Sequence, residues 1–334
     1  MASMRARRLA IVAGALFAIL ALALFWPVGA GGLIAHPRPA TSYEEAIARL
    51  DSLRALDTAA INPVCRTELM THGHRTARVI VLLHGLTNCP RQFQLLGEQL
   101  YARGENVLIA RLPRHGFADR LTPELASLTA RELAMFTDQV MDIAHGLGDH
   151  VTLAGLSAGG VMAAWAAQNR SDLDRAVVIA PLLGLPGLPL RLNPVIANFW
   201  LLTPNRFYWW DAKLREGVGG PRNCYPRYGT RPLGELLRLG FAVSAQAAHT
   251  KPAARAIVLV TNASDRAIDN RAVAALAHEW SERGAKDVTS YEFPAHLELG
   301  HDLIDPEQPY QKVRIVYPVL TKLLDPAAEP HEKE

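Results

Sequence analysis

The sequence lacks a clear excess of charge of either sign. Its 334 residues include 35 lysines and arginines against 32 aspartates and glutamates. Three of the basic residues, Arg5, Arg7 and Arg8, lie before the first apolar run, and without them the basic and acidic residues are equal in number, at 32 each. Proteins that bind nucleic acid usually carry a basic patch or stripe. The rest of the chain has no such excess, so we exclude a nucleic-acid-binding function.

Cysteine is scarce, and sequence repeats are missing. The three cysteines, Cys65, Cys89 and Cys224, are not spaced like the ligands of any zinc site. No internal repeat and no low-complexity segment follows the apolar N-terminal run. We therefore expect no structural metal site, and we expect one large globular domain rather than a repeat array.

The N-terminus carries a membrane-targeting pattern. The basic stretch at residues 5–8 precedes an uncharged apolar run over residues 9–26, which continues nearly unbroken to residue 35. A run of about 18 such residues can cross the hydrocarbon core as a helix. Residues 28–30 would also suit signal-peptide cleavage. Because positive charge keeps its flank in the cytoplasm, residues 1–35 are predicted to be a transmembrane anchor of a domain facing the periplasm or exterior, or a cleaved signal peptide of a secreted one.

Export would allow a disulfide bond to form. Residues 67–71 and 78–84 have the character of two strands joined by a turn at Gly73. If these strands pair as an antiparallel hairpin, Cys65 lies opposite the end of the second strand, a few residues from Cys89. We therefore hypothesise a Cys65–Cys89 disulfide with Cys224 free, and three unpaired thiols remain the alternative.

Beyond a short amphipathic helix at residues 40–56, strand and helix patterns alternate along the chain. Short runs rich in valine, isoleucine and leucine predict strands at residues 79–83, 106–111, 150–154, 175–180, 256–261 and 287–293. Helices are predicted between them at residues 92–103, 129–146, 158–169, 271–284 and 311–324. This alternation is typical of an α/β fold with a mostly parallel central sheet flanked by helices. We expect one such domain over residues 40–325.

One interval between predicted strands is unusually long. It spans residues 181–255, is interrupted by prolines and glycines, and carries a set of aromatic residues between Phe199 and Trp210. Long segments of this kind inside a compact domain are usually functional. We interpret residues 182–253 as a helical cap or lid insertion, and a helical excursion packed on its own aromatic residues is the alternative.

The strongest chemical signal is the pentapeptide Gly155-Leu156-Ser157-Ala158-Gly159. The pattern Gly-x-Ser-x-Gly forms a nucleophile elbow when it joins a strand to a helix. Here a strand pattern precedes it and a helix pattern follows it. The sharp turn strains the serine and brings backbone segments so close that a Cβ would clash at the glycines. Ser157 is therefore the predicted nucleophile.

A serine nucleophile also needs hydrogen-bond donors aimed at the oxyanion that it creates. The buried strand at residues 79–83 ends in His84-Gly85-Leu86. A glycine directly after the strand lets the backbone turn and point the next amide into the site. We predict that the backbone N–H groups of Leu86 and Ala158 form the oxyanion hole, and that His84 is structural.

These stretches resemble the α/β-hydrolase superfamily, especially bacterial carboxylesterases and monoacylglycerol lipases that have a cap. The similar segments are residues 82–85, 111–116 and 155–160, together with a late aspartate and histidine, and they span residues 65–324. The sequence departs from many relatives at residues 86–90 and at Arg114. The resemblance implies an α/β-hydrolase fold with a catalytic triad in the chain order nucleophile, acid, histidine.

In that order the acid and the histidine follow the nucleophile, so we expect both in the C-terminal part of the chain. The buried strand at residues 256–261 leads into Asp265, which is the predicted acid; Asp269 competes with it but is better placed as a helix N-cap. His301 follows the last strand and is the predicted base. His296 is nearer to that strand, but Gly300 would give the backbone freedom to turn the His301 imidazole inward.

The predicted chemistry is hydrolysis of a carboxylic ester through an acyl-enzyme. His301 would take the Ser157 proton while Asp265 orients the imidazole, and neither a metal nor an organic cofactor is required. The aromatic insertion and the N-terminal segment suggest apolar acyl esters or lipids as substrates and contact with a membrane. Acyl transfer or peptide hydrolysis by the same triad is an alternative, and so is a catalytically silent binding protein with this fold.

Overall fold

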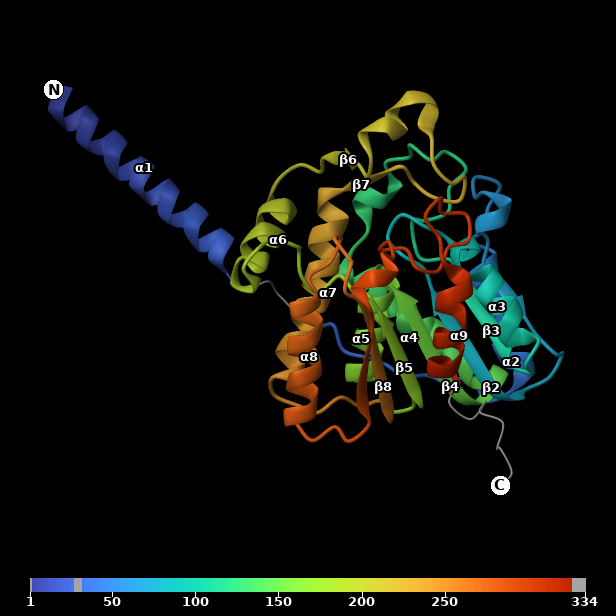
Figure 1. Ribbon diagram of the computed structural model, residues 1–334. Helices are drawn as coiled ribbons and strands as arrows, with labels where there is room; N and C mark the ends of the chain where they lie inside the picture. Colours follow the sequence, from blue (N-terminus) through green and yellow to red (C-terminus); the bar gives the residue numbers. More distant parts are fainter. Residues whose placement is uncertain (1, 27–31, 326–334) are drawn as a thin grey trace.

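The computed structural model describes residues 2–26 and 32–325 of the chain. In this part, seven strands form one sheet in the order β1-β3-β2-β4-β5-β8-β9 (Figure 1). Every neighbouring pair is parallel except β1 and β3. The strands are β1 (Glu68–Met70), β2 (Thr76–Leu83), β3 (Asn106–Ala110), β4 (Gly148–Leu156), β5 (Arg175–Ile179), β8 (Ala256–Asn262) and β9 (Val288–Phe293). The predicted α/β fold with a mostly parallel sheet is confirmed.

Helices cover both faces of this sheet, and the alternation of side chains along β2 shows why. Val79, Val81 and Leu83 are buried with α2, α4, α5, α7 and α8 on one face, whereas Ile80 and Leu82 are buried with α3 and α9 on the other. A strand that is covered on both faces has to be apolar at successive positions. The helices are α2 (Tyr43–Arg54), α3 (Gln94–Tyr101), α4 (Ala130–Leu147), α5 (Ala158–Asn169), α7 (Thr230–Ala247), α8 (Asn270–Glu282) and α9 (Val313–Leu324). Short 3-10 helices lie at Pro63–Cys65, Pro90–Phe93, Glu124–Ser127, Leu190–Leu192, Ala212–Val218 and Ala295–Leu297.

Strand β1 does not pair as the sequence pattern predicts. It lies antiparallel to β3, with Glu68 opposite Ile109, and not beside β2. Both edges of β2 already pair with β3 and β4 in parallel. The hairpin prediction is therefore wrong, because the central strand uses both edges for its parallel neighbours and leaves β1 only the outer edge of β3.

The segment over residues 182–253 lies between β5 and β8 and builds its own small layer. It contains α6 (Asn193–Leu202), the antiparallel pair β6 (Phe207–Trp209) and β7 (Arg227–Gly229), and α7. Helix α7 is the base of this layer: Leu236 and Leu239 are buried in the same core as α5. In Figure 1 the β6–β7 pair lies beyond the carboxyl ends of the central strands, the edge at which α/β folds bind ligands.

The N-terminal segment forms helix α1 (Ala2–Phe25), which extends away from the domain in Figure 1. Its end is held by Asn198 of α6, whose amide donates hydrogen bonds to the carbonyls of Leu24 (2.9 Å) and Trp26 (2.8 Å). The transmembrane anchor predicted over residues 1–35 is not supported: among the residues that the structure describes, no helix combines the length and apolar character needed to cross a membrane. The possible cleavage site at residues 28–30 lies outside the described residues.

Candidate active site

Ser157 lies on a strained turn between β4 and α5. Its backbone has φ 56° and ψ −105°, a conformation that side-chain-bearing residues rarely adopt. The Ser157 N–H donates to the Ile179 carbonyl of β5 (2.9 Å), which fixes the turn to the sheet. A Cβ on Gly155 would lie 2.1 Å from the Gly159 oxygen, and one on Gly159 would lie 2.0 Å from the Leu83 oxygen. The glycines thus allow the close backbone approach that a nucleophile elbow requires.

Asp265 and His301 come together from the ends of two neighbouring strands. Asp265 follows β8, His301 follows β9, and His301 Nδ1 lies 2.7 Å from Asp265 Oδ2. The Asp265 side chain is fully buried, and that of His301 is 25% exposed. Burial lowers the pKa of His301, but the hydrogen bond to Asp265 and the charges of Asp265 and Asp302 outweigh it, so the net pKa is raised above 6.5. The His301 imidazole is therefore a stronger base than an unperturbed histidine side chain.

Gly300 is needed for a reason other than the one that the sequence suggests. Its φ is not among the positive values that favour glycine. A Cβ at this position would lie 2.2 Å from the ring of Tyr310. Gly300 therefore makes room for the Tyr310 ring beside His301, and the expectation of special backbone freedom is wrong.

The other two candidates for acid and base lie elsewhere. Asp269 caps helix α8 and accepts from the Arg271 N–H (3.0 Å), with the Arg271 guanidinium 2.6 Å away. His296 is exposed in the loop after β9 and is not part of the cavity wall. Within the described part of the chain, neither side chain forms a hydrogen bond or an ion pair with Ser157 or His301.

The turn after β2 lies beside Ser157, since a Cβ on Gly85 would be 3.8 Å from the Ser157 Cβ. The N–H groups of Leu86 and Ala158 have no hydrogen-bond partner among residues 2–26 and 32–325. Gly85, Leu86 and Ser157 line the same cavity. His84 is fully buried and accepts from the Leu112 N–H (3.1 Å), so it braces the loop from behind. The arrangement leaves two amide N–H groups available to a negatively charged oxygen.

His115 braces the same turn, a role that the sequence analysis did not find. Its ring is fully buried, and Nε2 bonds to the Leu86 carbonyl while Nδ1 bonds to the Pro113 carbonyl (2.7 Å). Burial lowers the pKa of His115 to about 4. A neutral imidazole has one N–H, so it donates to one of these two carbonyls, and the ring lies between the Leu86 and Pro113 carbonyls and braces the turn. The signal was the stretch Leu112-Pro113-Arg114-His115-Gly116, which the resemblance had already marked.

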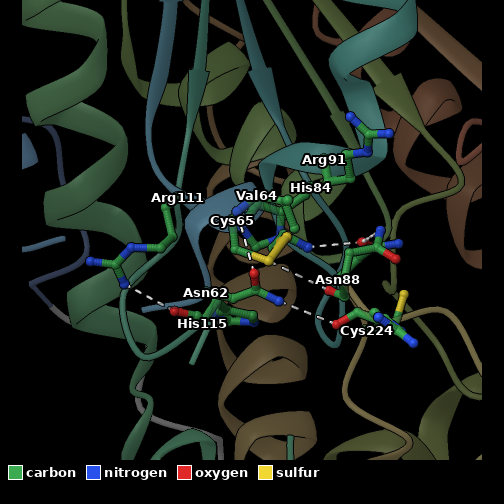
Figure 2. The surroundings of a disulfide bond; sticks show 12 residues. Asn62, Val64, Cys65, His84, Asn88, Arg91, Arg111, His115 and Cys224 are labelled. Carbon is green, nitrogen blue, oxygen red and sulfur yellow. Dashed lines mark hydrogen bonds between the residues drawn. A yellow bond between two sulfur atoms is a disulfide. The ribbon is translucent and has the colours of Figure 1, made fainter. Parts of the chain in front are cut away.

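A disulfide joins Cys65 to Cys89 and closes the other side of this turn (Figure 2). Both cysteines are buried and pack with Ile61 and Phe117. Cys224 carries a free thiol. The disulfide and the free cysteine are those that the sequence hypothesis names. The two cysteines meet even though β1 pairs with β3, because the chain before β1 still passes the turn that follows β2.

One cavity of about 790 Å³ connects these groups. Ser157 and His301 lie in its wall. The 182–253 segment supplies much of the remainder, including Trp200, Tyr208, Leu214, Tyr228 and Leu233. Trp210 also donates from Nε1 to the Thr87 hydroxyl (2.8 Å), and the Tyr225 N–H donates to the Thr87 carbonyl (2.7 Å). The segment is therefore attached to the turn that carries Leu86.

Within residues 2–26 and 32–325, no three histidine, cysteine, aspartate or glutamate side chains are grouped so that they could hold a metal ion. The Ser157 hydroxyl has no hydrogen-bond partner among these residues. Serine–histidine bonds in ligand-free sites are often long and tighten when substrate binds.

The chain belongs to the α/β hydrolase family, whose sequence pattern matches residues 80–314. This confirms the resemblance. No curated protein matches the sequence.

Solved structures of lipolytic enzymes share the fold. A monoacylglycerol lipase from Paleococcus ferrophilus matches with a TM-score of 0.58 at 17% identity, over 77% of this chain and 97% of that one. A metagenome-derived lipolytic enzyme matches at 0.56 and 15%, over 79% and 98%. A monoglyceride lipase from Saccharomyces cerevisiae, solved with a substrate analogue, matches at 0.55 and 13%, over 75% and 88%. At these identities the likeness shows the fold alone.

Proposed function

We propose that the protein is a serine hydrolase that cleaves carboxylic esters with Ser157 as nucleophile, His301 as base and Asp265 as acid. The observation that carries the proposal is geometric. A strained serine, a histidine hydrogen-bonded to a buried aspartate, and the unpaired N–H of Leu86 border one cavity, and the unpaired N–H of Ala158 directly follows the serine. Acyl transfer to water requires this combination of nucleophile, oriented base and oxyanion donors.

The mechanism follows from the positions of these groups. His301 takes the Ser157 proton as the hydroxyl attacks the ester carbonyl, and Asp265 stabilises the imidazolium that forms. The N–H groups of Leu86 and Ala158 donate to the oxyanion. His301 then protonates the leaving alcohol, and water activated by the same histidine releases the acid from Ser157. Removing one oxyanion donor typically costs about 100- to 1000-fold in turnover.

The cavity favours apolar substrates. Its wall combines leucines with the aromatic rings of Trp200, Tyr208, Trp210 and Tyr228. Trp210 and Tyr228 lie with ring centroids 4.2 Å apart, and both belong to the segment over residues 182–253. Lipases that act on monoacylglycerols share the fold. We propose that this segment acts as a cap and that the substrates are esters of apolar acyl chains, including monoacylglycerols.

An activity panel tests this function. Purified protein is assayed on p-nitrophenyl esters from acetate to palmitate and on a monoacylglycerol, and Ser157→Ala is expected to lose nearly all hydrolysis and all labelling by a fluorophosphonate. Ser281→Ala is the matched control, because Ser281 is exposed on α8 and bonds only to the Ala277 carbonyl (2.9 Å). Near wild-type turnover by Ser157→Ala would contradict the proposal. Preferential formation of methyl ester in added methanol would favour acyl transfer instead.

We also propose that the domain works outside the cytoplasm. A buried disulfide persists in oxidising compartments and is rare in reducing ones, and the Cys65–Cys89 pair is buried. Alkylation of denatured protein purified without reductant is expected to modify Cys224 alone. Modification of all three cysteines would exclude the disulfide and with it this support for export.

A further inference from the structure

A polar cluster lies directly behind the Ser157 site, and the proposed mechanism does not use it. Its members, called here the Asp302 cluster, are Asn88, Gln92, Asn223, Asp302, Asp305 and Gln308. Asn88, Gln92, Asn223 and Asp305 are each at most 5% exposed. The cluster joins three separate parts of the site: the turn that carries Leu86, the 182–253 segment, and the loop after His301.

Asn88 lies at the centre of this cluster. Its Nδ2 donates to Asp302 Oδ2 (3.0 Å) and to Asp305 Oδ2 (3.1 Å). Its Oδ1 accepts from the Cys89 N–H (2.9 Å) and from Asn223 Nδ2 (3.0 Å). The Asn88 N–H in turn donates to the Gly85 carbonyl (3.1 Å) and closes the oxyanion turn, residues 85–88. A single buried amide therefore ties that turn to the loop that begins with His301.

Gln92 makes a second link between the same two segments. Its Oε1 accepts from the Gly85 N–H (2.9 Å), and its side chain lies close enough to Asp302 to lower the pKa of that carboxyl group. The oxyanion turn is thus held at both ends, by Gln92 at Gly85 and by Asn88 itself. Asn88 connects this turn by hydrogen bonds to Asp302 and Asp305, and Gln92 lies beside Asp302.

In the described part of the chain, Asp302 accepts hydrogen bonds from neutral donors only. Its Oδ1 accepts from the N–H groups of Ile304 (3.3 Å) and Asp305 (3.1 Å), and its Oδ2 accepts from Asn88 and from Gln308 Nε2 (3.1 Å). No arginine or lysine of the described residues forms an ion pair with it. The titratable groups that face it electrostatically are His301, Asp305, Cys224, Tyr310 and Tyr317. Its negative charge therefore has no nearby cation to cancel it, and it immediately follows His301 in the chain.

From this geometry, and resting on the proposed function, we propose that Asp302 is a positioning residue. Through Asn88 and Gln92 it holds the Leu86 N–H in register with His301, and its carboxylate supplies a second negative charge that favours the imidazolium formed during attack. Asp265 orients the His301 imidazole through a hydrogen bond at Nδ1. Asp302 instead acts by fixing the loop that begins with His301 and by the electric field of its carboxylate at the imidazole.

The electrostatic part has independent support. The charge of Asp302 is among the causes that raise the pKa of His301. Burial and the neighbouring Asp305 raise the pKa of Asp302 itself, and its hydrogen bonds to backbone N–H groups offset only part of that rise. A carboxylate buried away from water acts on its neighbours more strongly than one in water. Removing this charge while keeping the shape should therefore make His301 a weaker base.

The pH dependence of kcat/KM on a p-nitrophenyl ester tests the proposal. In Asp302→Asn, the acid limb is expected to move to lower pH by about 0.5 to 1, because a nearby carboxylate favours the protonated histidine. We expect kcat to fall about 10-fold and KM to change little. Asp302→Glu keeps the charge and should keep the acid limb near its wild-type position. Asn88→Ala keeps the charge but removes the bridge, so kcat should fall without a shift of the acid limb.

Two matched variants serve as controls. Asp305→Asn removes the same charge from the same cluster, but Asp305 is not among the causes that shift the pKa of His301, so the acid limb should stay. Glu298→Gln removes an exposed charge three residues before His301 and should change nothing. An acid limb in Asp302→Asn that coincides with wild type overturns the electrostatic role. If that variant does not fold, an unchanged kcat in Asn88→Ala overturns the positioning role. Fluorophosphonate labelling of wild-type Ser157 separates these outcomes from failure of the proposed function, in which no labelling occurs.

Discussion

The Cys65–Cys89 disulfide offers the prediction whose size is most directly fixed by the structure. It joins residues 24 positions apart. In the chain-entropy description, a cross-link of this span removes conformational freedom from the unfolded chain and stabilises the folded state by about 3.5 kcal/mol. For a domain of this size, that free energy corresponds to a loss of about 5 °C in melting temperature when the bond is absent. The double variant Cys65→Ala/Cys89→Ala should show this loss.

The same bond should also affect turnover, because Cys89 follows Asn88 and closes the far side of the oxyanion turn. Without it, the Leu86 N–H loses one of its fixed supports, so kcat should fall while KM changes less. Thermal unfolding followed by circular dichroism, with and without a phosphine reductant, measures the stability, and ester hydrolysis measures kcat.

Cys224→Ala is the control for this experiment. It removes the free thiol and leaves the cross-link in place, so it should melt like wild type and respond to reductant like wild type. The reasoning is refuted if the double variant melts at the wild-type temperature, or if reductant lowers the melting temperature of the double variant as much as that of wild type.

Three further predictions follow from single features. Because the net pKa of His301 is raised above 6.5 and only the neutral imidazole can act as base, the acid limb of kcat/KM should have its midpoint above pH 6.5; a midpoint below that value would contradict the Asp265 contact. Gly159→Ala places a Cβ 2.0 Å from a carbonyl oxygen of β2, so it should lower both melting temperature and kcat, whereas Gly14→Ala, with nothing within 4 Å, should not. Arg170 is fully buried among three aspartates, so Arg170→Met should cost about 3 to 5 kcal/mol of unfolding free energy by leaving buried carboxylates unpaired. Arg255→Met breaks the ion pair between the exposed Arg255 and Asp174, and it should lower the unfolding free energy far less. Equal losses for the two variants in urea denaturation would show that burial does not decide the effect.

The candidate site depends on contacts that a sequence pattern reveals to very different degrees. Ser157 was predictable because an elbow is a local device: its steric demands fall on Gly155 and Gly159, two residues away on either side. Asp265 and His301 were predictable because each follows a strand of the parallel sheet, and parallel strands end at the same edge of the sheet. Their chain order came from the family resemblance.

The supports of the site were not predictable in this way. The contact between Asn88 and Asp302 joins residues 214 positions apart, and nothing local in either residue's surroundings indicates the other. His115 and Leu86 lie 29 positions apart, so no local pattern indicates that the His115 ring contacts the Leu86 carbonyl. The one visible signal for Asn88 was that residues 86–90 depart from the pattern of many relatives.

Local sequence thus determined the apolar strands, the helices between them and the strained turn at Ser157, because backbone sterics and side-chain alternation act over a few residues. Only the tertiary structure decided that β1 pairs with β3, since the outcome depends on which strand edges remain free. It alone decided why position 300 must be glycine, since the Tyr310 ring arrives from ten residues away. It alone brought two carboxylates and an amide behind the His301 loop, because burial and proximity between distant segments exist only once the chain has folded.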